Sequence, residues 1–405
     1  MPRLIYLHQY FQTPAEGGGT RSYEFAKRLA AAGYDVQMVT TDRSPNPGRG
    51  WSQETMDGFV IHRIGVPYSN HMGKWRRIAA FTQFALAASL KARHLNGDIV
   101  FATSTPLTIG FPGVAATLFR RAPLIFEVRD LWPEMPIALG FLKGKVQIAA
   151  AQWFERFIYR YSRHIVALSP GMRDGIVRII HDSAKVTVIP NSCDLDQFPA
   201  PPSDIGAWLD SHPTLKGRQI VLYAGTMGAV NGVDWIVRLA EAVRPADPSI
   251  AFVLMGDGAD RAKAEQLAKD RRLLGVNVFF LPPVPKHDVA CALGAASLAL
   301  SVFLPIKEME ANSANKFFDA LAAGRPVAIN YGGWQLELLQ EHGAGVRLDA
   351  HDLNQSAQDV VKLLGDPARL QAMGRSARLL AETVFARDAL GHVLIGLLGD
   401  SERQT

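Results

Sequence analysis

The chain has 405 residues, a length that favours two domains. Of these residues 48% are hydrophobic and 20% are charged, a composition that excludes a disordered protein. Neither its two cysteines, Cys193 and Cys291, nor its eleven histidines have the spacing of metal ligands, so we expect no disulfide framework and no metal. The chain opens on a strand-like segment and not on a signal peptide, which favours a cytosolic protein.

Charge is distributed unevenly along the chain. Residues 1–200 contain 23 lysines and arginines against 15 acidic residues, a balance of +8, whereas residues 201–405 contain 20 against 23, a balance of −3. The basic first half is therefore a candidate for contact with anionic lipid or with an anionic acceptor.

The first half begins with a β-α-β unit. An apolar strand at 4–7 precedes a glycine-rich loop, a helix at about 20–32 and a second strand at 36–40. Further apolar runs predict strands at 60–64, 99–102, 124–128, 165–168 and 186–189. Because helices separate most of these strands, we expect a mainly parallel sheet in a first domain that spans residues 1–198.

The glycine-rich loop is Gly17-Gly18-Gly19, between the first strand and the first helix. Gly18 and Gly19 would let backbone N–H groups approach an anion at the helix N-terminus. The loop lacks the G-x-G-x-x-G spacing of a dinucleotide fingerprint, and a plain flexible connection is the alternative.

Residues 68–93 combine an alanine-rich apolar stretch with cations at both ends, such as Arg76 and Arg93. This pattern suits a helix that lies on an anionic membrane surface. A core helix with solvated ends is the alternative.

Four charged residues lie at the end of the strand at 124–128, in the segment Glu127-Val128-Arg129-Asp130-Leu131-Trp132-Pro133-Glu134. Charged groups at a strand end are costly unless they are paired or used. Either Arg129 forms a structural ion pair with Glu127 or Asp130, or Asp130 or Glu134 contacts a bound substrate.

A proline-rich stretch at 198–203 separates the two halves and predicts a linker over residues 199–217. The strand before it ends in Pro190-Asn191. Asn191 is placed either to line a binding site or to close the domain in an Asx-turn.

The second half predicts another doubly wound domain, over residues 218–384. Its apolar runs indicate strands at 220–224, 252–255, 278–281, 298–302 and 327–329, a helix at 233–243, and a helical tail at about 366–398. We expect the last part of the chain, about 385–405, to join the first domain. Two such domains bind ligands at the carboxyl ends of their strands, so the expected active site is a cleft between them.

Glycine-containing turns follow two strands of this half, Gly225-Thr226-Met227-Gly228 and Gly256-Asp257-Gly258. The most informative stretch is 312–327, where an amide-rich turn leads into a short helix that Gly324 ends. Lys316 and Asp319 share one face of this helix near its N-terminus. A helix N-terminus, a lysine and a carboxylate together can hold a phosphate and a sugar hydroxyl, which indicates a nucleotide-sugar site.

The chain resembles the family 4 glycosyltransferases of the GT-B fold over almost its whole length. Four segments that carry the resemblance occur in the family's order: the 17–19 loop, Pro190-Asn191, the 256–258 turn and the segment from Lys316 to Pro326. Segments 127–134 and 311–319 are most similar to WbuB-type bacterial surface-polysaccharide glycosyltransferases. The resemblance implies an α/β fold of two Rossmann-like domains that face each other across a cleft. It also implies a retaining, metal-independent transferase with a UDP-sugar donor and no cofactor.

The resemblance assigns roles to individual residues. Asp319 would accept hydrogen bonds from the ribose, Lys316 would meet the diphosphate, and the loop with Gly18 and Gly19 would close on it. The uracil would lie near 256–258 and Pro283. The other donor-binding candidates are Asn191, Gly225, Thr226, Asn231, Gly256, Asp257, Asn312 and Asn315.

Two departures from the family pattern affect the catalytic candidates, which are Asp130, Glu310 and Lys316. The family commonly has two glutamates with seven residues between them, and counting back from Asp319 gives Ala311. Its neighbours Glu310 and Asn312 are therefore the candidates for contact with the sugar. The 225–228 turn contains no cation, so we expect Lys316 to be the principal cation on the diphosphate.

We therefore expect transfer of a sugar, such as N-acetyl-L-fucosamine or another hexosamine, from UDP to a lipid-linked saccharide at the inner face of the cytoplasmic membrane. Such a reaction would serve O-antigen, capsule or exopolysaccharide assembly and would involve no nucleic acid. A UDP-sugar epimerase of the same fold and a non-catalytic nucleotide-sugar-binding subunit are the alternatives.

Overall fold

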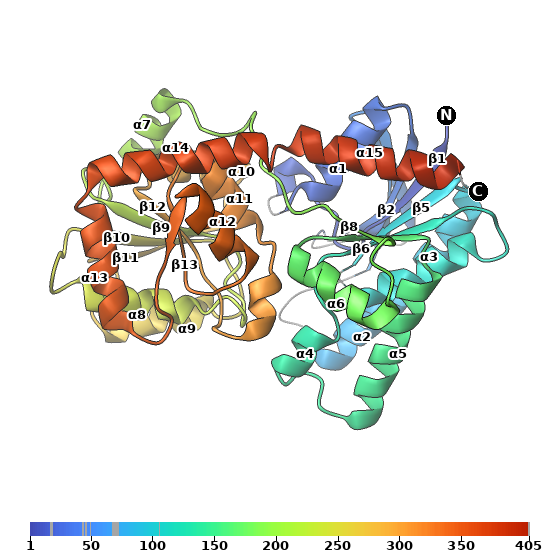
Figure 1. The fold of residues 1–405 in the computed structure, drawn as a ribbon, viewed down its shortest axis with the longest axis horizontal. Helices are drawn as coiled ribbons and strands as arrows, with labels where there is room; N and C mark the ends of the chain where they lie inside the picture. The colour runs from blue at the N-terminus through green and yellow to red at the C-terminus, as the bar shows by residue number, and fades with distance from the viewer. Residues whose placement is uncertain are drawn as a thin grey trace. The chain divides into compact units, whose positions relative to one another are not determined.

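The computed structural model describes residues 1–16, 19–42, 44, 47–48, 50–66, 73–104 and 106–403, and it divides into two compact units (Figure 1). The first unit contains Met1–Thr13, Gly19–Pro190 and, from Asp388 onward, the C-terminal helix. The second contains Asn191–Arg387 together with a short 3₁₀ helix, η1 (Pro14–Glu16).

The first unit is built on an eight-stranded sheet with the order β3-β4-β2-β1-β5-β6-β7-β8. Its neighbouring strands are parallel except for β3 and β4, which form an antiparallel hairpin. The strands are β1 (Arg3–Leu7), β2 (Asp35–Asp42), β3 (Trp51–Met56), β4 (Phe59–Gly65), β5 (Ile99–Thr103), β6 (Leu124–Val128), β7 (His164–Ala167) and β8 (Val186–Val188). Helices cover the sheet, so strands such as β5 and β6 are buried along their whole length.

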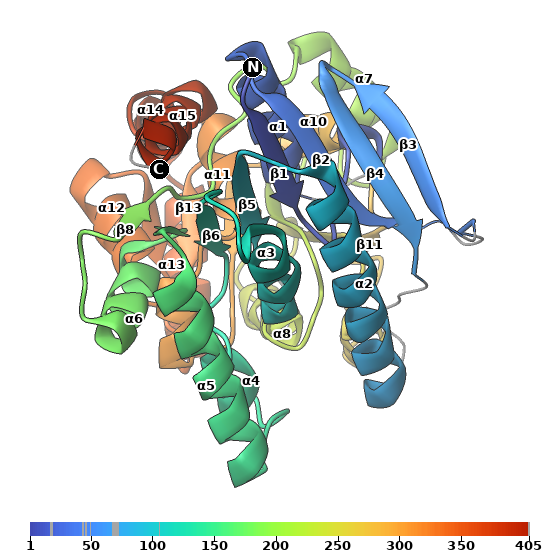
Figure 2. The same cartoon turned by 90° about the vertical axis from the view of Figure 1, so that its right-hand side faces the viewer.

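The helices of this unit are α1 (Arg21–Ala31), α2 (Lys74–Leu95), η2 (Leu107–Ile109), α3 (Gly110–Thr117), α4 (Glu134–Ala138), α5 (Lys145–Tyr161), α6 (Pro170–Ile180) and α15 (Arg387–Arg403). Figure 2 shows α2, α3 and α5 side by side, and α3 contacts both of its neighbours. From the far end of the chain, Leu394 and Leu398 of α15 enter the core around Leu4 and Tyr6. The C-terminal helix is thus an integral part of the first unit.

The second unit has a six-stranded, all-parallel sheet with the order β11-β10-β9-β12-β13-β14. Its strands are β9 (Ile220–Ala224), β10 (Ala251–Met255), β11 (Val278–Leu281), β12 (Leu298–Ser301), β13 (Val327–Ile329) and β14 (Gly345–Arg347). Its helices are α7 (Pro202–Ser211), α8 (Val233–Val243), α9 (Arg261–Asp270), α10 (Lys286–Ala295), η3 (Lys307–Ala311), α11 (Asn315–Ala322), α12 (Trp334–His342), α13 (Leu353–Leu364) and α14 (Pro367–Thr383).

Some boundaries differ from the sequence predictions. The stretch predicted as a linker, 199–217, contains α7, which packs against α10 and buries Trp208. The first unit ends at Pro190, eight residues before the predicted 198, and the second unit extends to Arg387. The predicted helical tail is two helices, α14 and α15, separated at 384–386.

A buried ion pair joins several elements of the first unit. Arg21, at the start of α1, and Glu127, near the end of β6, are 1% and 0% exposed, and Nη2 of Arg21 lies 2.8 Å from Oε1 of Glu127. The same guanidinium donates to the backbone oxygens of Ile189 (2.8 Å) and Pro190 (2.5 Å), while Thr103 Oγ1 donates to the other carboxylate oxygen (2.5 Å). Both charges are therefore compensated, as buried ions must be.

We predict that Glu127→Gln lowers the free energy of unfolding of the first unit by about 3–5 kcal/mol, because it leaves the Arg21 charge buried without a counter-charge. Denaturant unfolding followed by fluorescence measures this loss. Arg3→Met, which removes an exposed ion pair with Asp35, is the control and should cost at most about 1 kcal/mol. Equal effects of the two substitutions would contradict the structural role of the buried pair.

Candidate functional site

The carboxyl ends of β9, β10, β11 and β12 lie along one edge of the second sheet. The chain winds outward from β9 through β10 to β11, and in the opposite direction from β12 through β13 to β14. The order therefore reverses between β9 and β12. Ligands of open parallel sheets bind outside the strands at such a reversal.

Two of the predicted turns pack backbone against backbone at this edge. Gly225 N donates to Met255 O (2.9 Å), and Met227 N donates to Asp257 O (2.8 Å). A Cβ at Gly256, whose φ is +137°, would overlap the carbonyl oxygen of Gly225, so only glycine fits there. The two turns form one rigid support beside the reversal point.

The polar residues of these turns differ in what they offer a ligand. The buried Asn231 accepts from Gly228 N (3.1 Å) and so holds the β9 turn in shape. Thr226 and Asp257 are exposed, as is Pro283 in the loop after β11. These three surface residues are available to a ligand, whereas Asn231 acts on the turn itself.

Lys316 lies in the first turn of α11, and its ammonium lies against two aromatic rings. Nζ lies 3.8 Å from the ring centre of Phe303 and 5.1 Å from that of Tyr223. Within the described part of the chain, no carboxylate forms an ion pair with it. Burial lowers the pKa of Lys316 to about 7, and the aromatic faces only partly replace the lost hydration.

Asp319, one turn further along α11, is paired with a residue that the sequence analysis did not identify. Lys286 Nζ, at the start of α10, lies 2.5 Å from Asp319 Oδ1. Burial raises the pKa of Asp319, and the Lys286 ammonium opposes this shift. Asp319 and Lys316 line one small cavity between α11 and β9, so the structure brings them together as predicted. In the sequence, the one indication that Lys286 belongs to the site was its position directly after the 282–285 loop.

The two candidates on either side of Ala311 are not equivalent. The buried Asn312 uses its side chain within the turn: Nδ2 donates to Met309 O (2.7 Å), and Oδ1 accepts from Ala314 N (3.2 Å). Glu310 is exposed beside the glycine pair at 332–333, where a Cβ on Gly332 would lie 2.9 Å from its Oε1. Glu310 therefore has a carboxylate available for a ligand, whereas Asn312 stabilises the turn before α11.

Asn191 stabilises the same turn from outside. Its backbone N donates to Ser313 Oγ (3.1 Å), and its Nδ2 donates to Ser313 O (2.5 Å). Its buried Oδ1 has no hydrogen-bond partner among the described residues. Asn315, the first residue of α11, is half-buried next to Lys316. Asn191 thus fixes the start of α11 and leaves one acceptor unused.

The candidates in the first unit lie at the carboxyl ends of its strands. Asp130 is exposed after β6, and Gly19 is half-buried just before α1, while Gly18 lies outside the described residues. Of the alternatives for the 127–134 segment, an ion pair of Arg129 with Glu127 is not found among the described residues: Glu127 pairs with Arg21, and the Nη1 of Arg129 lies 3.3 Å from Nε2 of His8. A cleft shared by the two units stays a prediction.

Among the described residues, no three histidine, cysteine or acidic side chains are arranged to hold a metal ion. None of the helices in this part of the chain is long and apolar enough to span a membrane.

Comparisons with known proteins give a consistent picture. A glycosyl transferase 4-like domain model matches residues 16–192, and a glycosyl transferases group 1 model matches residues 218–366. The chain is 24% identical to the probable glycosyltransferase WbjE of Pseudomonas aeruginosa over 67% of each chain. It is also 24% identical to glycogen synthase of Mycobacterium tuberculosis, over 93% of this chain and 89% of the relative.

Solved structures are similar in fold over nearly the whole chain. Sucrose-phosphate synthase from Thermosynechococcus elongatus superposes with a TM-score of 0.81 at 19% identity and covers 100% of both chains. WaaG, a glycosyltransferase of lipopolysaccharide biosynthesis, superposes with a TM-score of 0.71 at 16% identity, over 96% of this chain and 99% of its own. These similarities confirm the predicted fold class. Because the two family models together match most of the chain, the protein belongs to the family 4-type glycosyltransferases of the GT-B fold.

Proposed function

We propose that the protein is a retaining, metal-independent glycosyltransferase that moves a sugar from UDP to a lipid-linked saccharide in bacterial O-antigen, capsule or exopolysaccharide assembly. The observation that carries the proposal is the Lys316 ammonium, which lies against aromatic rings at the N-terminus of α11 without a described carboxylate partner. Similar folds have been solved with such donors, among them Anabaena HepE with UDP-glucose and Escherichia coli trehalose-6-phosphate synthase with UDP-2-fluoro glucose. A relative from E. coli, WcaI, is named for colanic acid biosynthesis.

In this proposal the second unit holds the donor. Lys316 and the first N–H groups of α11 meet the diphosphate, which supplies the negative charge that Lys316 lacks. Asp319, oriented by Lys286, accepts hydrogen bonds from the ribose through its second carboxylate oxygen. Thr226 and the backbone at 256–258, with Pro283, border the base.

The same groups would lower the reaction barrier. Breaking the bond between the sugar and the diphosphate places additional negative charge on the leaving phosphate. Preorganised cations and amides stabilise that charge better than water does, because they need no reorganisation during the reaction. Glu310 is the carboxylate that we assign to the transferred sugar, and Asp130 is the candidate on the acceptor side.

The test is a panel of UDP-, GDP- and dTDP-sugars with an undecaprenyl-type saccharide acceptor, with and without EDTA. We expect acceptor-dependent release of UDP that EDTA does not change, and a loss of about 100- to 1,000-fold in turnover for Lys316→Met. Lys263→Met, which removes an exposed lysine of α9, is the matched control and should keep full activity.

Other outcomes of this panel separate the alternatives. Isomerisation of the sugar without release of UDP would identify an epimerase, and binding without either reaction would identify a non-catalytic subunit. GDP release would keep the transferase but change the donor, as in the GDP-mannose-dependent mannosyltransferase of M. tuberculosis to which this chain is 24% identical. Unchanged turnover in Lys316→Met would contradict the assignment of the diphosphate to this residue.

The lowered pKa of Lys316 predicts a pH dependence of donor binding. In the free protein the pKa of Lys316 is about 7, so at pH 7 half of the molecules have a neutral Lys316 amine. A bound diphosphate favours the protonated form and therefore raises this pKa. Binding therefore takes up a proton above pH 7. We expect the affinity for UDP to fall between pH 7 and pH 9, by up to about tenfold per pH unit.

Calorimetry in buffers with different ionisation enthalpies measures this proton uptake directly. Lys316→Arg keeps its charge over the whole range, so its affinity should not show the fall. Equal pH slopes for the wild type and Lys316→Arg would mean that another group takes up the proton.

Contact with an anionic membrane surface is the other part of the proposal, and the side chains that support it are more fully described in α5 than in the 68–93 stretch. In α2, Phe84 and Ala88 are buried while Leu86 (65%) and Leu90 (75%) are exposed. Residues 68–72 and the side chains of Lys74, Trp75 and Arg77, at the basic start of that stretch, lie outside the described part. Along α5 and the loop before it, large apolar side chains are exposed: Phe141 (64%), Val146 (83%), Trp153 (67%) and Phe157 (38%).

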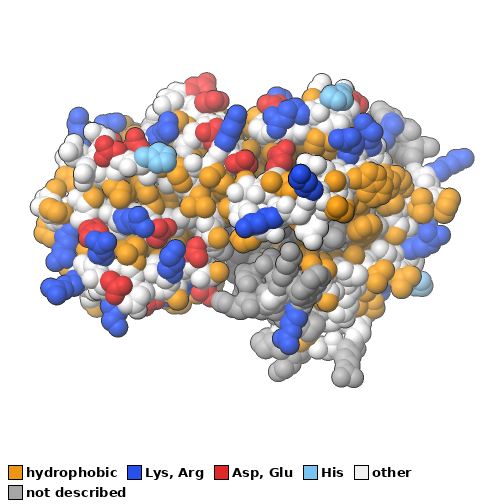
Figure 3. All heavy atoms as spheres, turned by 90° about the horizontal axis from the view of Figure 1, so that it is seen from below, with side chains coloured by type: hydrophobic (Ala, Val, Ile, Leu, Met, Phe, Trp, Pro, Cys, Tyr) orange, Lys and Arg blue, Asp and Glu red, His pale blue; other side chains and the backbone are white. Residues whose placement is uncertain are grey.

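The exposed charged residues of α5 and of the loop before it are all basic. They are Lys143, Lys145, Arg156 and Arg160. The one acidic residue of α5, Glu155, is buried, and this burial raises its pKa to about 8, so it is mostly neutral at pH 7. Figure 3 shows hydrophobic side chains gathered with lysines and arginines on one face of this unit. Such a surface suits the interface of an anionic bilayer.

We expect the double substitution Trp153→Ser/Phe157→Ser to weaken binding to phosphatidylglycerol vesicles at least about tenfold, because two aromatic rings no longer enter the bilayer. Vesicle co-sedimentation measures the affinity. Leu379→Ser, at an exposed apolar position of α14, is the control and should bind as the wild type does. If the control lost as much affinity as the α5 variant, α5 would not be the docking face.

A further inference from the structure

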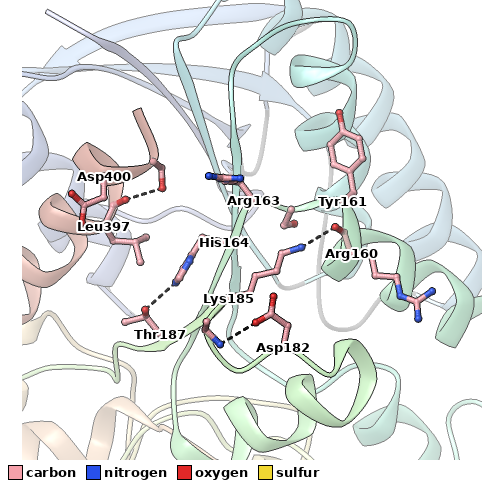
Figure 4. A pocket seen from close by; sticks show the side chains of 12 residues that line it. Arg160, Tyr161, Arg163, His164, Asp182, Lys185, Thr187, Leu397 and Asp400 are labelled. Carbon is pink, nitrogen blue, oxygen red and sulfur yellow. Dashed lines mark hydrogen bonds between the residues drawn. The ribbon is translucent and has the colours of Figure 1, made fainter. Parts of the chain in front are cut away.

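A cavity of about 760 Å³ lies in the first unit, at the amino ends of β7 and β8 (Figure 4). Its wall is formed by residues 160–164 before and within β7, by the segment from Asp182 to Thr187, and by Leu397, Asp400 and Ser401 of α15. Asp130, the candidate of this unit, follows the carboxyl end of β6, so the cavity is at the opposite edge of the same sheet. Its size is within the usual range of small-molecule sites.

Basic side chains from separate elements converge on this cavity. Lys185 Nζ donates to Arg160 O (2.8 Å), and His164 Nε2 lies 2.9 Å from Thr187 Oγ1. Figure 4 shows Arg163, His164 and Lys185 around the same centre. Burial lowers the pKa values of both Lys185 and His164, and the nearby Arg163 lowers them further. The pKa values therefore indicate that positive charge is costly here in the absence of an anion.

Two acidic residues, Asp182 and Asp400, also belong to the wall of the cavity. Asp182 raises the pKa of both His164 and Lys185, but its Oδ1 also accepts from Ala184 N (3.1 Å) and so holds the turn before β8. Asp400 is exposed on α15. The wall thus combines the basic groups of Lys185, His164 and Arg163 with two carboxylates, and the pKa values of Lys185 and His164 both lie below their usual range.

We propose that this cavity binds the phosphate group of an anionic ligand. Lys185 has two further N–H donors, and Arg163, His164 and Thr187 add a guanidinium, an imidazole and a hydroxyl, a donor set suited to phosphate oxygens. The ligand is either a soluble phosphate ester or a phospholipid head group. An apolar groove of about 510 Å³, lined by Trp153 and Phe157, shares Arg160 and Tyr161 with the cavity, which gives an acyl chain a place beside the phosphate. The inference does not rest on the proposed transferase activity.

The His164 imidazole provides a local readout that does not depend on donor binding in the second unit. Histidine NMR spectra are followed against pH in inorganic phosphate and in chloride at equal ionic strength, and His164→Gln assigns the resonance. We expect phosphate to raise the measured pKa of His164 by about 0.5 or more, because an anion beside it favours the imidazolium. Lys185→Met should abolish this response, and Lys27→Met, at an exposed position of α1, should leave it intact.

The second arm of the experiment distinguishes the sources of the phosphate. Vesicles of phosphatidic acid in phosphatidylcholine are compared with phosphatidylcholine alone. A response to inorganic phosphate without a larger response to the phosphatidic acid vesicles supports a soluble ester, and a response mainly to these vesicles supports a head group. If His164 titrates identically in phosphate, chloride and both vesicle preparations, or if Lys185→Met responds as the wild type does, the cavity is not a phosphate site.

Discussion

A lysine ammonium that is withdrawn from water must be compensated by a counter-charge, by polar groups or by aromatic faces, and the binding edge of the second unit is arranged around this requirement. The rings of Phe303 and Tyr223 lie against the Lys316 ammonium, no described carboxylate forms an ion pair with it, and its pKa is lowered accordingly. The ring of Tyr223 comes from β9 and that of Phe303 from the loop after β12, so the ammonium sits where the strand order reverses. A diphosphate at the N-terminus of α11 would supply the missing charge and meet the helix amides at the same time.

The buried charged groups of the protein differ in how completely they are compensated, and this difference separates structural roles from binding roles. Arg21 and Glu127 satisfy each other and use further backbone and hydroxyl partners, so they hold elements of the first unit together. Asp319 has Lys286 as a counter-ion but keeps a second carboxylate oxygen, which suits a ribose hydroxyl. Lys316, with no described counter-ion, is the group most dependent on an incoming anion.

Much of the fold was predictable because the central strands are continuous apolar runs that parallel sheets bury on both faces. The hairpin strand β3 was missed because WSQETM is polar and exposed, and α7 was missed because its proline-rich start is typical of a linker although it buries Trp208. At the site, Lys316 and Asp319 were predictable from their spacing on one helix. The pairing of Asp319 with Lys286, 33 residues away, and of Arg21 with Glu127, 106 residues away, depends on tertiary packing that no local pattern encodes. The role of Asn312 within its turn likewise became visible only in its hydrogen bonds.

The central claim is that the N-terminus of α11 holds the diphosphate of the donor. A crystal structure of the protein with bound UDP tests it most directly. The account predicts phosphate oxygens within hydrogen-bonding distance of Lys316 Nζ and of the first N–H groups of α11, with the ribose hydroxyls at Asp319. UDP bound elsewhere, with Lys316 still against the rings of Phe303 and Tyr223 and without a phosphate contact, would contradict it.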